Sequence, residues 1–145
     1  MKIERSVTTG ASPQTVFDYL ADFSTTNEWD PGTVKTTRSR GDGGVGTEYH
    51  NVSRFLGRKT ELNYTVEEYL PGSRIALRGE NSTVVAHDTI TVREEAPDRT
   101  RVDYRAEFSF KGLARLAAPL LAPAFRKLGD DAERGLSEAL DQLPS

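Results

Sequence analysis

The alternation of apolar and polar residues changes period along the chain. Residues 2–9 alternate and are rich in β-forming residues, which predicts a strand. Ser12 followed by Pro13 is typical of a helix N-cap and first helical position. Apolar residues at helical spacing then predict a short helix to about Asp22, and residues 24–30 allow a second short helix before Pro31 and Gly32.

From residue 33 to residue 111 the period becomes two. The pattern predicts strands at 33–40, 46–56, 58–69, 73–79, 83–95 and 99–111. Glycine, proline, asparagine and aspartate stand between these strands, and the connections are short. Short connections between successive strands favour antiparallel hairpins.

After Gly112 the pattern becomes helical. One apolar stripe is predicted along the rest of the chain: Leu113, Leu116, Leu120, Leu121, Phe125, Leu128, Ala132, Leu136, Leu140 and Leu143. Pro119 and Pro123 interrupt its first half, so the helix kinks there or a new helix of about 20 residues begins at Pro123. Because this helix has one apolar stripe and the sheet one apolar face, we expect each to cover the other.

Asp88 is the exception in an otherwise regular strand pattern. It falls on the apolar phase of 83–95, whereas its neighbour His87 falls on the outward phase. One interpretation is a bulge near Asp88, or a position at the wet rim of the sheet. The other is a carboxyl group inside a cavity, where desolvation raises its pKa. For strand 46–56 the inward phase stays ambiguous, because apolar residues occupy both phases.

The composition of the chain excludes several kinds of functional site. The chain has 145 residues, a length typical of a single domain covering 1–145. It has no cysteine and two histidines, which excludes disulfides, thiolate metal sites and a three-histidine site within one chain. The net charge of −3 argues against nucleic-acid binding. The apolar runs are too short for a membrane span, and the charged start without a secretory segment predicts a cytoplasmic protein.

Two sequence motifs that could suggest a catalytic site have simpler explanations. Residues 41–46 spell G-x-G-x-x-G, but a strand follows where a dinucleotide site needs a helix, so the motif predicts a hairpin loop. The acidic pairs at 67–68 and 94–95 are neighbours within strands, so their side chains point to opposite faces and form no dyad.

Several short segments together resemble the SRPBCC superfamily, and its polyketide cyclase/dehydrase-like subgroup in particular. They are Ala11 to Phe17 (ASPQTVF), Leu20 to Asp22, Trp29 to Pro31, Gly44 to Thr47, Tyr64 to Glu67, Pro71 to Arg74 and Thr100 to Val102. The resemblance implies an α+β helix-grip (START-like) fold, with a seven-stranded antiparallel curved sheet wrapped around a long C-terminal helix. Two short helices follow the first strand, and a cavity between sheet and helix takes hydrophobic molecules such as lipids, quinones or aromatic polyketides.

The resemblance and the strand phases together give a set of expected site residues. Those expected to line the cavity are Trp29, Tyr64, Ile90, Tyr104, Ala106, Phe108, Leu120 and Phe125. Three functions stay open: binding of a hydrophobic small molecule, a cofactor-free cyclase or dehydratase, and a protein-interaction module. For an enzyme, Asp88, Tyr64, Tyr104 and His50 are the available proton-transfer groups. We expect no metal and no cofactor, and a monomer or weak homodimer.

Overall fold

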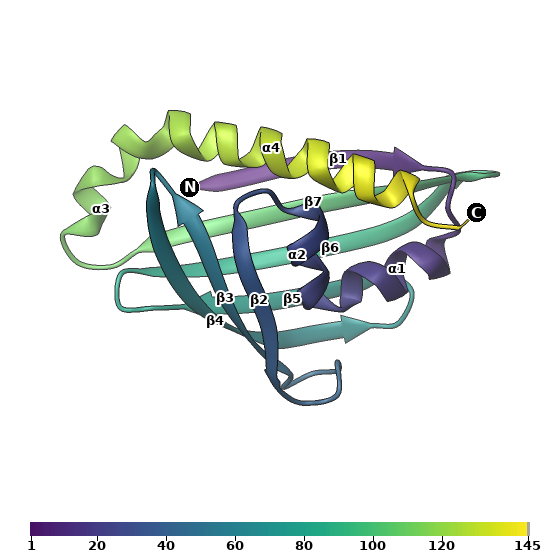
Figure 1. Ribbon diagram of the computed structural model, residues 1–145, viewed down its shortest axis with the longest axis horizontal. Coiled ribbons are helices and arrows are strands. Elements are labelled where there is room, and N and C mark those ends of the chain that lie inside the picture. The colour runs from purple at the N-terminus through teal and green to yellow at the C-terminus, as the bar shows by residue number, and fades with distance from the viewer. Residues whose placement is uncertain (145) are drawn as a thin grey trace.

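The computed structural model describes residues 1–144, and it has one antiparallel sheet with a long helix across it (Figure 1). The strands are β1 (Lys2–Thr9), β2 (Thr33–Arg40), β3 (Glu48–Phe55), β4 (Arg58–Leu70), β5 (Arg74–Glu80), β6 (Val84–Ala96) and β7 (Arg99–Phe110). The helices are α1 (Pro13–Ala21), α2 (Thr26–Trp29), α3 (Ala114–Ala117) and α4 (Ala122–Asp141), with 3-10 turns η1 (Phe23–Thr25) and η2 (Ala118–Leu121). This is the expected helix-grip α+β fold.

The first two strands of the chain lie at opposite edges of the sheet. Strands β2 to β7 form a meander, and β1 pairs with β7, so the order is β1-β7-β6-β5-β4-β3-β2. Register shifts interrupt the β2–β3, β4–β5 and β6–β7 pairs. Extra residues of this kind bend a strand and increase its twist, which curves the sheet around α4.

Local sequence explains where the first helix begins. The hydroxyl of Ser12 accepts a hydrogen bond from the backbone N–H of Thr15 at 3.2 Å, and Pro13 takes the first helical position. The cap satisfies a backbone N–H that has no partner inside the helix. The helix then buries Val16, Phe17 and Leu20 against the end of the sheet. Among residues 1–144, no helix is long and apolar enough to cross a membrane.

The apolar stripe predicted after Gly112 is exposed in its first part and buried in its second, and the change occurs at the break that the prolines predicted. Helix α4 buries Phe125, Ala132, Leu136 and Leu140, and each large apolar side chain so buried contributes about 1.5–3 kcal/mol. The prediction of one continuous buried stripe is wrong for its first part, because Leu113, Leu116 and Leu120 are 85%, 77% and 82% exposed. The breaks at α3 and η2 turn these three leucines away from the sheet.

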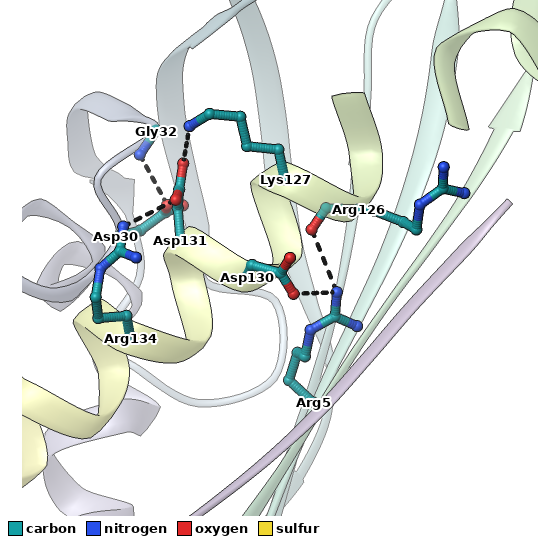
Figure 2. A network of polar contacts seen from close by, with 8 residues as sticks. All are labelled: Arg5, Asp30, Gly32, Arg126, Lys127, Asp130, Asp131 and Arg134. Carbon is teal, nitrogen blue, oxygen red and sulfur yellow. Dashed lines mark hydrogen bonds and ion pairs between the residues drawn. The ribbon is translucent and has the colours of Figure 1, made fainter. Parts of the chain in front are cut away.

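Ion pairs and hydrogen bonds fasten α4 over the first strand (Figure 2). The guanidinium of Arg5 on β1 donates to Asp130 at 2.9 Å and to the backbone carbonyl of Arg126 at 3.3 Å. On the other side of α4, Asp131 accepts a hydrogen bond from Lys127 within the same helix, and this contact lowers the pKa of the Asp131 carboxyl. The helix is therefore tied to the sheet edge at mid-length, where it covers the concave face.

Candidate functional site

A cavity of about 310 Å³ lies between the concave face of the sheet and α4. This volume is at the lower end of those that hold small-molecule ligands. Strands β3, β4, β6 and β7 supply one wall, and α2 and α4 supply the other. Most of the wall is apolar or aromatic, and polar side chains lie both near Asp88 and near Arg54 at the outer end.

The end of the cavity nearest to α3 is aromatic. The ring of Phe125 on α4 packs against those of Phe55 and Phe108, with centroids 4.8 Å apart in both pairs, and against that of Phe110 at 5.9 Å. Offset and edge contacts of this type are the favoured geometries for aromatic rings. The exposed Arg54 borders the cavity at this end, so the aromatic cluster separates the interior from the surface.

The deeper end contains a buried carboxyl group. Along β6 every second side chain is buried: Val84, Ala86, Asp88, Ile90 and Val92. Asp88 lies four residues, or about 13 Å, beyond Val84. Asp88 is 4% exposed and lines the cavity. Its Oδ2 accepts a hydrogen bond from the hydroxyl of Tyr104 at 3.0 Å, whereas its Oδ1 has no hydrogen-bond partner among the described residues.

Burial changes the chemistry of this carboxyl group. Desolvation raises the pKa of Asp88 to about 7, the hydrogen bond from Tyr104 opposes that rise, and the charge of Asp30 adds to it. The interior therefore contains a group that exchanges a proton near neutral pH. It can donate a hydrogen bond when protonated and accept further hydrogen bonds when ionised.

Two further polar side chains face the same end. Tyr64 on β4 is 6% exposed, and its ring packs at 4.9 Å from that of Phe23. Asp30 follows α2, accepts hydrogen bonds from the N–H of Gly32 and the hydroxyl of Thr33, and has a pKa raised by burial. Both carboxyl groups of the cavity wall are thus acids in an apolar environment, and among the described lining residues the only cation is Arg54 at the outer end.

Close backbone approach shapes this end of the cavity. Gly79 on β5 pairs with Tyr64, and a side-chain carbon at Gly79 would lie 2.6 Å from the tyrosine ring. Gly135 on α4 lies against the backbone carbonyl of Trp29 in the same manner. Glycine at these two positions lets the Tyr64 ring and the Trp29 segment occupy space that any larger residue would take.

The residues expected to form the site are distributed over four places. Seven of them line the cavity: Trp29, Tyr64, Asp88, Tyr104, Ala106, Phe108 and Phe125. Ile90 is buried in the core beyond its inner end, and Leu120 is 82% exposed on η2, so neither lines the wall. His50 lies on the outer face of the sheet, where its ring nitrogens are 2.9 Å from Asn63 and 3.1 Å from Glu61.

The two interpretations of Asp88 can now be distinguished. No register shift occurs near Asp88 in either the β5–β6 or the β6–β7 pair, and the residue is buried. The bulge and wet-rim interpretations are therefore wrong, because the strand runs regularly through this position. In β3 the inward phase is that of Tyr49 and Asn51, which are both buried.

Sequence reasoning missed some wall residues. Asp30 carried no periodic signal, because it stands in the loop after α2 rather than in a strand. Asn51 was missed because apolar residues occupy both phases of its strand, which left the inward phase open; its amide donates to the hydroxyl of Thr36 in the interior. Within residues 1–144, no group of three or more histidine, aspartate or glutamate side chains lies close enough to bind a metal ion.

Comparison with known proteins agrees with this arrangement. Residues 1–141 match the family described as polyketide cyclase / dehydrase and lipid transport. Similar solved structures include the Zhui aromatase/cyclase from Streptomyces sp. R1128, with a TM-score of 0.82, 15% identity, and coverage of 97% of this chain and 93% of that chain. A START superfamily protein from Mycobacterium smegmatis has a TM-score of 0.75 at 15% identity, with 96% of each chain covered.

A third similar structure is a protein from Thermus thermophilus, with a TM-score of 0.80, 14% identity and 97% of each chain covered. No curated protein matches the chain. At these identities the solved structures establish the fold alone. The match to the family extends over nearly the whole chain, and it includes every element that forms the cavity. The chain therefore belongs to the polyketide cyclase / dehydrase and lipid transport family.

Proposed function

We propose that this protein binds a hydrophobic small molecule in the cavity between the sheet and α4. The observation that carries the proposal is the division of the cavity into an aromatic outer end and a deeper end with the unpartnered Oδ1 of Asp88. An elongated apolar or ring-containing molecule with one polar group matches this division. Its apolar body lies among the phenylalanines, and its polar group reaches Asp88 and Tyr104.

The charge of the cavity wall limits which polar group a ligand can place at the deeper end. Asp30 and Asp88 are the two acids that face the interior, and the one cation among the described wall residues lies at the outer end. A ligand carboxylate at the deep end would face two carboxyl groups without a compensating cation, which is unfavourable in a low-dielectric site. A hydroxyl or amine can instead donate to Oδ1. We therefore favour a ligand whose buried group is a hydrogen-bond donor over a fatty-acid anion.

The chain offers its own reporter for a binding experiment. Trp29 is the only tryptophan, it is 2% exposed, and it lines the cavity. Binding of a ring-containing molecule should therefore change its fluorescence. At pH 8, 2-naphthol should quench or shift the Trp29 emission in a saturable manner, and 2-naphthoate should bind at least tenfold more weakly. Equal affinity for the two probes would contradict the donor preference, and no saturable change with either would contradict binding in this cavity.

Replacement of Asp88 gives the matched test. In Asp88→Asn the side chain keeps its shape and loses its charge, so the difference between 2-naphthol and 2-naphthoate should shrink. Native mass spectrometry of protein purified without denaturation then identifies the natural molecule. A bound species with a carboxylate as its only polar group would contradict the assignment.

A cyclase or dehydratase is the second candidate function. The observation in its favour is the hydrogen bond between Tyr104 and Asp88, a carboxyl group with a pKa near neutrality. General acid–base catalysis works best with such a group, and an aldol closure followed by loss of water needs a proton removed from carbon and one delivered to oxygen. If the protein is such an enzyme, Asp88→Asn abolishes formation of the cyclised, dehydrated product from a linear poly-β-ketone, as measured by mass. Unchanged product formation in this variant would rule out Asp88 as the proton-transfer group.

A further inference from the structure

Four leucines project into solvent around the outer end of the cavity. Leu113 and Leu116 in the α3 segment, Leu120 on η2 and Leu56 at the β3–β4 turn are 85%, 77%, 82% and 64% exposed. A groove lined by Leu56 and Leu120 joins the β3–β4 turn to the η2 segment, so the two places border each other. Figure 1 shows α3 at the end of the molecule farthest from the β6–β7 turn. Several large apolar side chains exposed together mark a contact surface.

Positive charge is concentrated in the same two segments. Residues 52–60 contain three arginines and lysines, residues 111–127 contain four, and neither segment contains an aspartate or glutamate. The chain as a whole has a net charge of −3, so these two segments are positive on an acidic protein, and the acids beside them include Glu80 and Asp131. In residues 1–144, Lys111 and Lys127 form ion pairs, whereas the other five do not: Arg54, Arg58, Lys59, Arg115 and Arg126.

We propose that this end of the molecule, defined by residues 54–59 and 111–127, docks onto an anionic lipid surface. Leucines that protrude singly can enter the interfacial region of a bilayer, and unpaired arginines and lysines beside them can contact lipid phosphates. Apolar burial and attraction to anionic lipids act together in this mode of binding. Neither requires a segment that crosses the membrane.

The distribution of charge argues against a second copy of the same chain as the occupant. A two-fold interface brings the same patch of each molecule together. Here that would place the unpaired cations of one copy against those of the other, with no acidic residue in either segment to compensate. An anionic bilayer supplies the opposite charge for all of them. Its apolar interior also accepts leucines without a preformed groove.

The docking surface lies at the outer end of the cavity, so docking would affect how a ligand enters and leaves; this consequence rests on the proposed function. Phe55, Phe110 and Phe125 separate the interior from the surface at this same end. A docked molecule would therefore have the outer end of its cavity against the bilayer. A hydrophobic ligand could pass between bilayer and cavity without crossing water.

Vesicle co-sedimentation tests the docking independently of any ligand. The wild-type protein should sediment with vesicles of phosphatidylglycerol and phosphatidylcholine in equal parts. It should bind vesicles of phosphatidylcholine alone at least tenfold more weakly, and high salt should release it. Equal binding to both vesicle types, or no binding to either, would overturn the proposal.

Two variants and their controls locate the contact. The triple change Leu113→Ser, Leu116→Ser and Leu120→Ser removes only exposed side chains, so the fold should persist by circular dichroism while vesicle binding falls at least tenfold. The control Leu70→Ser, at an exposed leucine at the end of β4, should bind as the wild type does. Wild-type binding by the triple variant would overturn the proposal.

The second variant, Arg58→Glu with Arg115→Glu, should lose binding, whereas the charge-matched control Arg93→Glu with Arg99→Glu should retain it. Equal losses in these two double variants would mean that net charge rather than this surface drives binding, which overturns the assignment. Sedimentation velocity without vesicles tests the remaining alternative, in which a second copy of the chain occupies this surface. A stable dimer that the leucine changes dissociate would assign the surface to a second copy and would also overturn the proposal.

Discussion

The hydroxyl of Tyr104 lies 3.0 Å from Oδ2 of Asp88, and the two side chains come from directly neighbouring strands. This hydrogen bond stabilises the ionised carboxylate, whereas burial and the charge of Asp30 favour the protonated form. The pKa of Asp88 is therefore set by three named contributions, two of which single substitutions can remove.

Substitution of Tyr104 and substitution of Asp30 should shift the pKa of Asp88 in opposite directions. Tyr104→Phe deletes the hydrogen bond to the carboxylate, so the pKa of Asp88 should rise above its value of about 7. Asp30→Asn deletes a nearby negative charge, so the pKa should fall. Carboxyl carbon chemical shifts measured by NMR across the pH range report both changes. Shifts of the same sign in the two variants would contradict this account.

The stability of the protein should depend on pH through Asp88. Its pKa is raised from 3.8 in the unfolded chain to about 7 in the folded protein. The folded state thus prefers the proton, and the associated stability is fully present below pH 4 and is lost as pH rises to about 7. Asp88→Asn has no such loss. Its free energy of unfolding relative to the wild type should therefore increase between pH 4 and pH 7, by up to roughly 4 kcal/mol, and stay constant above that.

Denaturant unfolding at several pH values measures this difference. Asp42→Asn, in the exposed loop before β3, is the control for loss of one carboxyl group. The same pH dependence in both variants, or a flat difference for Asp88→Asn, would mean that burial of Asp88 does not cause the effect.

A tryptophan at position 106 should fill the cavity. Ala106 is 1% exposed, lines the wall and stands directly across from Asp88 in the neighbouring strand. A large ring there takes the space a ligand would occupy. Ala106→Trp should therefore abolish binding of an environment-sensitive apolar dye, while the far-ultraviolet circular dichroism keeps its form. Ser109→Trp, on the exposed face of the same strand, is the control. Undiminished dye binding by Ala106→Trp would place the binding site elsewhere.

The sequence was informative where periodicity carries the signal. Alternation in β6 and β7 located Asp88, Tyr104, Ala106 and Phe108 on one face, because inward and outward residues of a half-buried strand differ in polarity. The same rule gave no assignment for Asn51, which is polar and buried, because apolar residues occupy both phases of its strand. Position along a strand is thus predictable from pattern, whereas a polar residue with an interior partner is not.

The C-terminal segment shows a second limit of the pattern. Leu120 and Phe125 belong to one helical stripe in the sequence, yet Phe125 lines the cavity and Leu120 faces solvent. The stripe assumes one straight helix, and the turns around Pro119 and Pro123 change its direction. The prolines predicted the break, but the direction of the chain after a break depends on tertiary contacts. Asp30 was missed for the same reason, since its position is set by a loop.

Gly79 should be intolerant of a side chain because of Tyr64. A Cβ atom at Gly79 would lie 2.6 Å from the Tyr64 ring, so Gly79→Ala should displace the ring and cost about 1–3 kcal/mol of stability. The double variant Gly79→Ala with Tyr64→Leu should recover part of that loss, because the smaller side chain leaves room. A double-mutant cycle of unfolding free energies measures the coupling. Additive effects would mean that the cost arises from the β5 backbone rather than from the ring.

The α3–η2 segment, which connects the wall residues Phe110 and Phe125, should be the part of the chain that opens at the outer end of the cavity. None of its residues is buried, and the backbone hydrogen bonds at its start are 3-10 contacts of 3.1–3.3 Å. Helix α4, in contrast, buries four apolar side chains and Gly129. Elements with few buried contacts open at low free-energy cost. Amide hydrogen exchange should therefore be faster at 113–121 than at 125–140, and a bound apolar ligand should slow it.

The same opening makes Pro119 and Pro123 matter for access to the cavity more than for stability. Each proline removes a backbone donor and disfavours a continuous helix, by roughly 3 kcal/mol at an interior position. Replacement of both by alanine should allow α3, η2 and α4 to join, and stopped-flow measurements should then show slower ligand association with little change in unfolding free energy. Pro97→Ala, in the β6–β7 turn at the opposite end, should leave association unchanged. Uniformly slow exchange from 112 to 140 in the free protein would contradict this opening and direct attention to the loop at 41–46.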